Sequence, residues 1–124
     1  MLKREKRSGI IFNASIAADF VLPCNAIYTG SKSFVDKFAR CLAFEHPGKI
    51  DVLSYKPSRV SSNLFKVEPR FDVLTPTQAA SSAMDKLGWD TETQGHWRHV
   101  LTNAPLKLFT SILPEKTSME ILRK

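Results

Sequence analysis

Two short runs of strand-forming residues flank one long segment with helical periodicity, and this order constrains the fold most strongly. The first run, residues 10–12, follows Gly9 and gives way to small polar residues at 13–15. The second run, residues 50–55, stops before Pro57, which cannot join the hydrogen bonding of a sheet interior. A continuous apolar run such as the first is typical of a buried parallel strand, and in the second run Ile50 and Val52 share one face of a strand. The chain is therefore predicted to be an α/β protein whose helices cover a parallel sheet.

Apolar spacing and capping residues mark two helices. Between residues 31 and 45, apolar side chains recur at helical spacing, and residues 46–48 (His-Pro-Gly) end the pattern. Residues 75–78 form a capping box with proline at the first helical position, so a second helix begins there. Gly88 is the expected C-terminal cap of this second helix.

The two ends of the chain are less regular. Residues 1–7 are expected to be the end of a helix that leads into the first strand. Residues 97–101 are predicted as a third strand, and residues 104–124, which contain two prolines, as helical. With no repeat and no clear linker, residues 1–124 are interpreted as a single domain unit.

Composition excludes several classes of protein. Apolar residues make up 43% and charged residues 24%, as in soluble globular domains. The net charge of +6 includes a basic run at residues 3–7, but no nucleic-acid-binding signature accompanies it, so this run is interpreted as a solvated face. Cys24 and Cys41 are interpreted as reduced packing residues of an intracellular protein. No segment has the length and hydrophobicity of a transmembrane helix or a signal peptide.

Three residues have the chemistry of a proton-transfer site. Tyr28 and Lys32 lie four residues apart at the start of the long helix, and Ser15 lies thirteen residues before Tyr28 at the end of the first strand. Residues four apart share a helix face, so the Lys32 ammonium can approach the Tyr28 phenol and favour its phenolate form. Each residue alone also suits an ordinary structural role. Their combination favours acid–base catalysis, with Ser15 holding the substrate oxygen.

Three blocks, residues 10–15, 28–34 and 57–62, together resemble the catalytic half of the short-chain dehydrogenases, which move hydride between a nicotinamide dinucleotide and a carbonyl or alcohol. Residues 28–35, the Leu22-Pro23 step and residues 95–99 are most similar to the branch containing very-long-chain 3-ketoacyl-CoA reductases and 17β-hydroxysteroid dehydrogenases. The resemblance implies part of a Rossmann-type doubly wound parallel sheet. It also implies an acyl-CoA or other carbonyl substrate and residence in the endoplasmic reticulum.

The resemblance assigns a role to each matching residue. It implies that Ser15 orients the substrate carbonyl and that Tyr28 gives it a proton. It also implies that Lys32 tunes Tyr28 and binds the nicotinamide ribose, and that Tyr28 is among the residues expected to contact the cofactor. Pro57, Val60 and Ser62 match the loop that meets the nicotinamide end of NAD or NADP. The sequence favours neither nucleotide over the other.

Two substitutions and one absence depart from the family pattern. Ser58 follows the proline where the family usually has glycine, and Ala14 replaces the first of two serines. The five glycines are scattered, and none forms the glycine-rich turn that cradles the dinucleotide phosphates. We therefore expect the chain to lack the N-terminal nucleotide-binding half and to be inactive in isolation.

Two other interpretations were considered. His46, His96 and His99 invite a zinc site, but side chains three residues apart in a strand point to opposite faces, so no metal is expected. The second is a non-catalytic remnant or interaction module, which would dimerise through the apolar helix at residues 31–45. Nicotinamide-nucleotide binding separates this module from a reductase.

Overall fold

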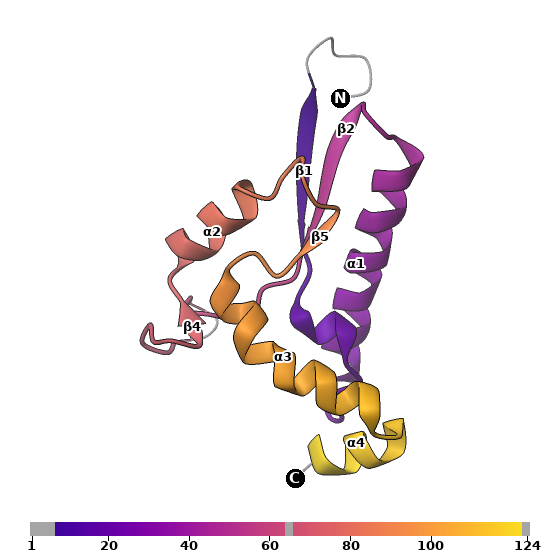
Figure 1. The fold of residues 1–124 in the computed structure, drawn as a ribbon, viewed down its shortest axis with the longest axis vertical. Coiled ribbons are helices and arrows are strands. Elements are labelled where there is room, and N and C mark those ends of the chain that lie inside the picture. The colour runs from indigo at the N-terminus through magenta and orange to yellow at the C-terminus, as the bar shows by residue number, and fades with distance from the viewer. Residues whose placement is uncertain (1–6, 64–65, 123–124) are drawn as a thin grey trace.

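The computed structural model describes residues 7–63 and 66–122. Its elements alternate between strand and helix along much of the chain, as Figure 1 shows. They are β1 (Ser8–Asn13), the 3-10 helix η1 (Ile16–Asp19), α1 (Ala26–Glu45), β2 (Ile50–Tyr55), β3 (Arg59–Val60), β4 (Val73–Leu74), α2 (Pro76–Met84), β5 (Glu92–Thr93), α3 (Trp97–Ile112) and α4 (Glu115–Leu122). The predicted α/β class and the first two strands are confirmed. Most of the predicted N-terminal helix, residues 1–7, lies outside the described residues.

The main sheet has the strand order β1-β2-β5 and is parallel throughout. β1 and β2 pair along their whole length, from Ser8 opposite Ile50 to Asn13 opposite Tyr55. β5 adds two residues beside the carboxyl end of β2. Beyond the main sheet, β3 and β4 form a short parallel pair. Because all three strands of the main sheet run the same way, their carboxyl ends meet at one edge, where open α/β sheets place their sites.

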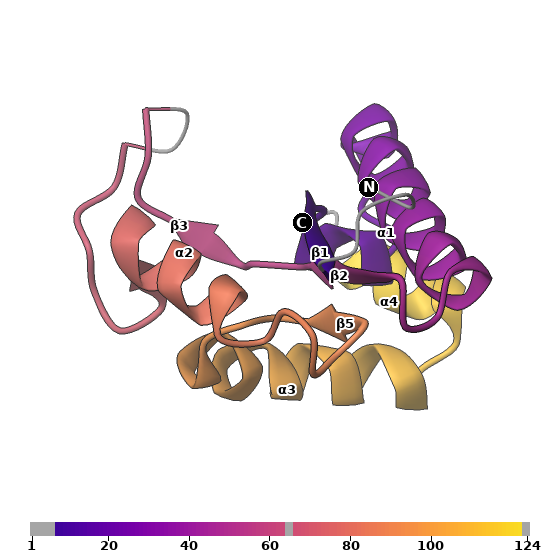
Figure 2. The same ribbon diagram turned by 90° about the horizontal axis from the view of Figure 1, so that it is seen from above.

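Alternate side chains of β1 and β2 point to two different hydrophobic clusters, one on each face of the sheet. Ile50 and Val52 pack with Ala39 of α1, together with Ile10 and Phe12 of β1. On the other face, Tyr55 packs with Leu74, Ala79 and Ala83, and with Ile11 and Val60. Figure 2 shows α1 on one side of β1 and β2, and Ala79 and Ala83 bring α2 against the other side. The sheet is therefore covered on both faces, as a parallel sheet requires.

The capping box at the start of α2 is confirmed. The Thr75 side chain accepts a hydrogen bond from the Gln78 backbone N–H, and the Gln78 side chain accepts one from the Thr75 backbone N–H. The predicted C-terminal cap is wrong, because α2 ends at Met84 and Asp85 takes the cap position. Gly88 lies in the following turn with a φ of +88°. Its left-handed backbone explains the glycine, but it serves the turn and does not end the helix.

The predicted third strand at residues 97–101 is wrong, because these residues begin the helix α3. The strand lies earlier, at Glu92–Thr93, and the His96 side chain caps α3 by accepting from the Arg98 backbone N–H. α3 is unusual because its polar side chains are the buried ones. His99 is fully buried and Asn103 is 8% exposed, whereas Trp97 is 59% exposed. The predicted helical tail is confirmed, with Pro105 inside α3.

The long helix α1 begins five residues before the predicted start and turns part of its apolar surface to solvent. Ala39 and Asp36 are its buried residues, whereas Phe34 and Phe44 are 69% and 74% exposed. Neither cysteine is buried, so the prediction that both are packing residues is wrong. No helix within residues 7–63 or 66–122 is long and apolar enough to cross a membrane.

Candidate active site

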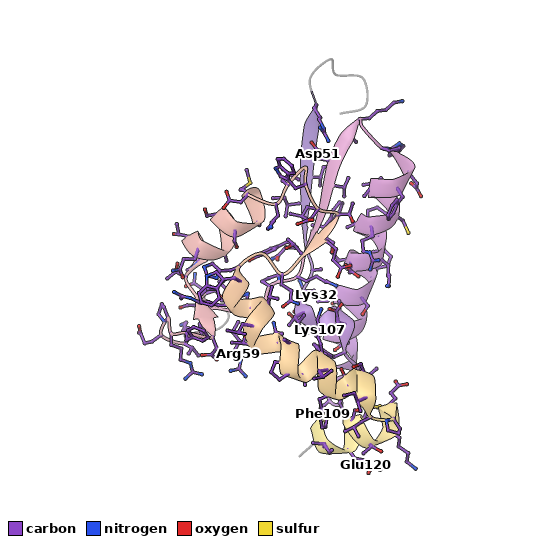
Figure 3. The ribbon with its side chains drawn as sticks, viewed as in Figure 1. Lys32, Asp51, Arg59, Lys107, Phe109 and Glu120 are labelled. Atoms are coloured by element: carbon purple, nitrogen blue, oxygen red, sulfur yellow. The ribbon has the colours of Figure 1, made fainter. Side chains whose placement is uncertain are left out.

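Lys32 lies one turn after Tyr28 on α1 and is held at the end of β1. Its ammonium donates a hydrogen bond to the Asn13 backbone carbonyl at 3.0 Å. The same ammonium lies 5.8 Å from the centre of the Tyr28 ring. Figure 3 places Lys32 where the sheet and α1 converge. The predicted proximity of the two side chains is therefore present, and Asn13 provides an anchor that the sequence analysis did not identify.

Ser15 follows β1 directly and caps the 3-10 helix η1. Its hydroxyl oxygen accepts from the Ala17 backbone N–H at 3.2 Å, which leaves the hydroxyl proton available as a donor. The backbone on both sides of Ser15 is tied to the end of β2. The N–H of Ala14 bonds the Tyr55 carbonyl at 2.8 Å, and that of Ile16 bonds the Pro57 carbonyl at 3.0 Å. Ser15 and the loop after β2 are thus fixed relative to each other.

A cavity of about 750 Å³, cavity A, opens at the carboxyl edge of the sheet. All six residues singled out from the sequence line it: Ser15, Tyr28, Lys32, Pro57, Val60 and Ser62. Its other walls are largely apolar, formed by Ile11 of β1 and by Ala79, Ala80, Ala83 and Met84 of α2. Its volume suits an organic ligand. Lys32 places a positive charge on its wall.

A second cavity of about 790 Å³, cavity B, lies on the far side of Ser15 and Tyr28. Both residues line both cavities, whereas Lys32 lines cavity A alone. Cavity B is bounded by the η1 region and by α3, with the apolar residues Ile16, Ala17, Phe20, Leu22 and Leu106. The two hydroxyl-bearing side chains therefore lie on a wall that both cavities share.

The loop after β2 supplies the rest of that shared wall. Ser58 and Arg59 line both cavities, although the sequence analysis assigned neither a role. Figure 3 shows Arg59 near the start of α3. His99 of α3 accepts a hydrogen bond from the Ser58 backbone N–H at 3.2 Å, and its other ring nitrogen lies 3.1 Å from the Arg59 carbonyl. A correct helix prediction for residues 97–112 would have placed His99 and Asn103 on one face, four residues apart.

The histidines do not assemble into a metal site in the described parts of the chain. His96 caps α3, and both ring nitrogens of His99 face backbone groups. Within residues 7–63 and 66–122, no three His, Cys, Asp or Glu side chains are grouped to hold a metal ion.

Comparison with known proteins gives three related matches. The family model for short chain dehydrogenases matches residues 1–71. A very-long-chain 3-oxoacyl-CoA reductase from Anas platyrhynchos is 37% identical over 100% of this chain, and one from Macaca fascicularis is 33% identical over 97%. The matches cover 39% and 42% of those relatives, so the chain spans about two fifths of their length.

The fold also matches a solved structure described as a 7β-hydroxysteroid dehydrogenase. The TM-score is 0.74, and the match covers 94% of this chain and 48% of that one, at 19% sequence identity. The predicted Rossmann-type α/β architecture is confirmed for the part of the fold that this chain represents. The predicted resemblance to very-long-chain 3-ketoacyl-CoA reductases is confirmed by the relatives.

Proposed function

Because the chain belongs to the short-chain dehydrogenase family, we propose that it carries the catalytic residues of an NAD(P)-dependent oxidoreductase that reduces a carbonyl compound. One observation supports this function above all others. Ser15 and Tyr28 line two cavities at once, so both residues lie at the boundary where a hydride donor and a carbonyl would meet. A carbonyl bound at this shared wall could receive hydride from a cofactor in one cavity and a proton from a residue of the wall.

In this proposal Tyr28 is the general acid. When bound, a reduced nicotinamide supplies hydride to the carbonyl carbon, and the Tyr28 hydroxyl gives its proton to the carbonyl oxygen. The product is an alcohol and Tyr28 is left as phenolate, which the nearby Lys32 ammonium stabilises. The Ser15 hydroxyl donates to the substrate oxygen and orients it. Tyr28 is 46% exposed, so solvent can return its proton.

We assign the nicotinamide end of NADP or NAD to cavity A. Its chemistry suits such a group because an apolar wall from α2 faces the polar side chains of Lys32 and Ser62. Lys32 gives one N–H to the Asn13 carbonyl, and the ammonium has two more to offer to ribose hydroxyls. Pro57 and Val60 complete the wall on the side of the loop after β2.

We assign the substrate to cavity B. Its apolar residues from η1 and α3 suit a fatty acyl chain or a steroid. Relatives named very-long-chain 3-oxoacyl-CoA reductases favour a 3-ketoacyl-CoA. The same resemblance supports residence of the natural protein in the endoplasmic reticulum, and residues 1–124 as one partial domain of the family.

Nucleotide binding by a complete enzyme that contains these residues tests this function. Titration with NADPH and NADH, followed by cofactor fluorescence, is expected to saturate with at least one of them. Addition of a 3-ketoacyl-CoA should then oxidise the bound cofactor. A ketosteroid of similar size is the second substrate to compare with it. If neither nucleotide binds and neither substrate is reduced, the reductase proposal is wrong.

The 124 residues alone form a second arm of this experiment. We expect no measurable turnover from them, because they contain no glycine-rich turn to hold the cofactor phosphates. Positioning of the reacting groups accounts for about 7–11 kcal/mol of such a barrier. Cofactor oxidation by these 124 residues at an ordinary enzymatic rate would contradict this expectation.

An interaction module is the second candidate function, and the exposed face of α1 favours it. The rings of Phe34 and Phe38 stack with their centres 5.9 Å apart. These two side chains are 69% and 47% exposed, and Phe44 is 74% exposed. We propose that a second copy of the chain covers this face. A failure of both nucleotides to bind, together with a dimer in sedimentation that Phe34→Glu dissociates, would favour the module over the reductase.

A further inference from the structure

His99 is a fully buried histidine whose ring faces the loop after β2. Nδ1 lies 3.2 Å from the Ser58 backbone nitrogen, and Nε2 lies 3.1 Å from the Arg59 carbonyl oxygen. A backbone N–H can only donate, so Nδ1 must accept. A carbonyl can only accept, so Nε2 must carry the proton. These two contacts fit one form of the ring, the neutral tautomer protonated at Nε2.

Asn103, one helical turn after His99, holds the same loop by a side chain. The Ser58 hydroxyl lies 3.3 Å from the Asn103 side-chain oxygen, and Asn103 is 8% exposed. Asn103 is in turn 2.9 Å from the side chain of Gln94. A glycine, which the family usually has after the proline, could not make the hydroxyl contact. The serine is therefore matched to α3 in this chain.

From these contacts we infer that His99 and Asn103 are positioning residues, which clamp the Ser58–Arg59 turn and so set the shape of the wall between the two cavities. This inference rests on the proposed function. Ser58 and Arg59 line both cavities, and Pro57 and Val60 on either side of them line cavity A. Releasing the turn would change the walls of both cavities, while the bond from Lys32 to the Asn13 carbonyl would stay in place.

The surroundings of His99 keep its ring neutral. Burial lowers the pKa of His99 below its ordinary value of 6.5, and the nearby His96 lowers it further, against the raising effects of the Arg59 and Gln94 backbones and of Asp72. The Asp72 carboxylate is itself paired with the Arg59 guanidinium at 3.0 Å. Protonation of Nδ1 would place a second donor against the Ser58 N–H. The clamp is therefore complete above pH 6.5 and is lost as pH falls through the lowered pKa of His99.

Nuclear magnetic resonance of the protein tests the clamp itself. At pH 7.5 the His99 ring nitrogens should show the neutral Nε2-protonated tautomer, and the Ser58 amide should be protected from hydrogen exchange. His99→Phe should lower that protection about tenfold, and His99→Asn, which keeps an acceptor near the Nδ1 position, should restore most of it. A charged ring, or unchanged exchange in His99→Phe, would overturn the clamp.

Steady-state kinetics of the same variants test the positioning role. His99→Phe is expected to raise the KM for NADPH about tenfold, whereas a purely structural defect would lower the amount of active enzyme and leave KM unchanged. Asn103→Ala should raise the KM for NADPH by a smaller factor. His46→Phe, at the far end of α1, is the matched control and should leave this KM unchanged. An intact clamp with an unchanged KM would overturn the positioning role. A wild type that binds no nucleotide would overturn the proposed function, and the positioning role with it.

Discussion

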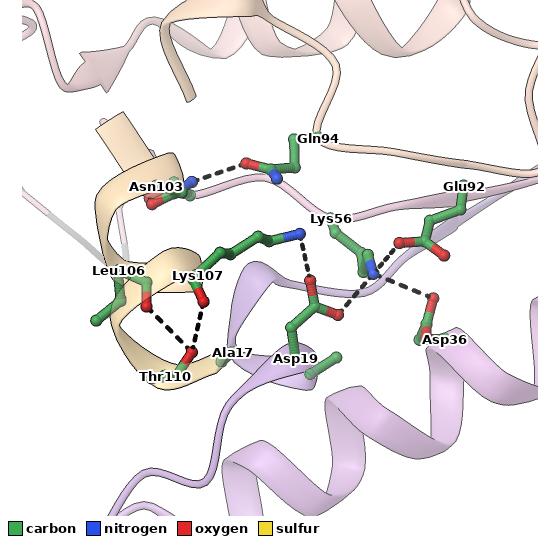
Figure 4. Close-up of polar contacts among 12 residues, drawn as sticks. Ala17, Asp19, Asp36, Lys56, Glu92, Gln94, Asn103, Leu106, Lys107 and Thr110 are labelled. Atoms are coloured by element: carbon green, nitrogen blue, oxygen red, sulfur yellow. Dashed lines mark hydrogen bonds and ion pairs between the residues drawn. The ribbon is translucent and has the colours of Figure 1, made fainter. Parts of the chain in front are cut away.

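Replacing Lys56 by methionine is expected to lower the free energy of unfolding by about 3 kcal/mol, the lower end of the range for breaking a buried ion pair. The Lys56 side chain is 2% exposed and lies directly before the loop of the shared wall. Its ammonium contacts Asp19 at 2.6 Å, Asp36 at 3.9 Å and Glu92 (Figure 4). Methionine fills the space but leaves three carboxylates facing one another.

The surrounding charges decide how large the loss becomes. Arg40 pairs with Glu92 at 3.0 Å and with Asp36 at 3.7 Å, and Lys107 pairs with Asp19 at 2.8 Å. These cations remain in Lys56→Met and compensate part of the negative charge that loses its Lys56 partner. Water reaches Asp19 and Glu92, whose side chains are 22% and 33% exposed. For both reasons we expect the lower end of the range.

The difference in free energy of unfolding between the wild type and Lys56→Met should depend on pH. Burial raises the pKa of Asp19, but its contacts with Lys107 and Lys56 outweigh burial and hold the pKa below 3.8. Burial likewise lowers the pKa of Lys56, and Asp19 and Glu92 raise it above 10.5. Asp19 then stabilises the fold above pH 3.8, and Lys56 does so below pH 10.5. The loss in Lys56→Met should be largest between these values and shrink as pH falls through the lowered pKa of Asp19.

Urea unfolding followed by circular dichroism measures this difference. Lys107→Met is the matched control, because Lys107 contacts the same Asp19 from a side chain that is 39% exposed, and such pairs contribute about 0–1 kcal/mol. Lys56→Arg keeps the charge and should lose less than Lys56→Met. Stability of Lys56→Met within 1 kcal/mol of the wild type at pH 7 would show that the buried ammonium is not needed.

The Lys56 cluster also shows where sequence-based prediction reaches its limit. Its members come from η1, α1, β5 and α3 and from Lys56 just after β2, so no local pattern joins them. By contrast, β1 and β2 were predictable from short runs of strand-forming residues and most of α1 from its helical spacing. The capping box of α2 was predictable because its two bonds link residues three apart. Local sequence patterns predicted these helices and strands, whereas the buried ion pairs depend on which helices and strands pack together.

The failed prediction at residues 97–101 has a related physical cause. Trp97, Val100 and Leu101 have the spacing of a helix face, but that face is exposed and the polar residues His99 and Asn103 are buried. Sequence analysis that expects apolar residues inside cannot anticipate this inversion. The inversion follows from the loop after β2, whose backbone groups need polar partners from α3.

The candidate site was more predictable than the tail because its residues belong to short blocks with a chemical reason for their spacing. Tyr28 and Lys32 share a helix turn, and Ser15 ends a strand that the helix covers. All six predicted residues line one cavity. The second cavity and the contacts of Ser58 with α3 depend on the tertiary fold, so the sequence did not indicate them.

Within a complete enzyme, Tyr28→Phe is expected to reduce kcat for carbonyl reduction by about 10²–10⁴-fold, because it removes the proposed general acid and nothing else. The Tyr28 side chain is 46% exposed, and one hydroxyl lost from such a position changes stability little. Cofactor affinity should stay near that of the wild type, because Lys32 keeps its bond to the Asn13 carbonyl. The expected pattern is thus a collapse of kcat with nucleotide binding retained.

Lys32→Met distinguishes the role of Lys32 from that of the general acid Tyr28. Removing the ammonium takes away both the charge beside the Tyr28 ring and the donors proposed for the ribose, so kcat and nucleotide affinity should fall together. Single-turnover kinetics with NADPH and a 3-ketoacyl-CoA, combined with fluorescence titration of each variant, measure the two effects separately. A Tyr28→Phe protein that keeps the wild-type kcat would require another proton donor. Ser15, the other hydroxyl that lines both cavities, would then be the residue to test, because its proton is not committed to η1.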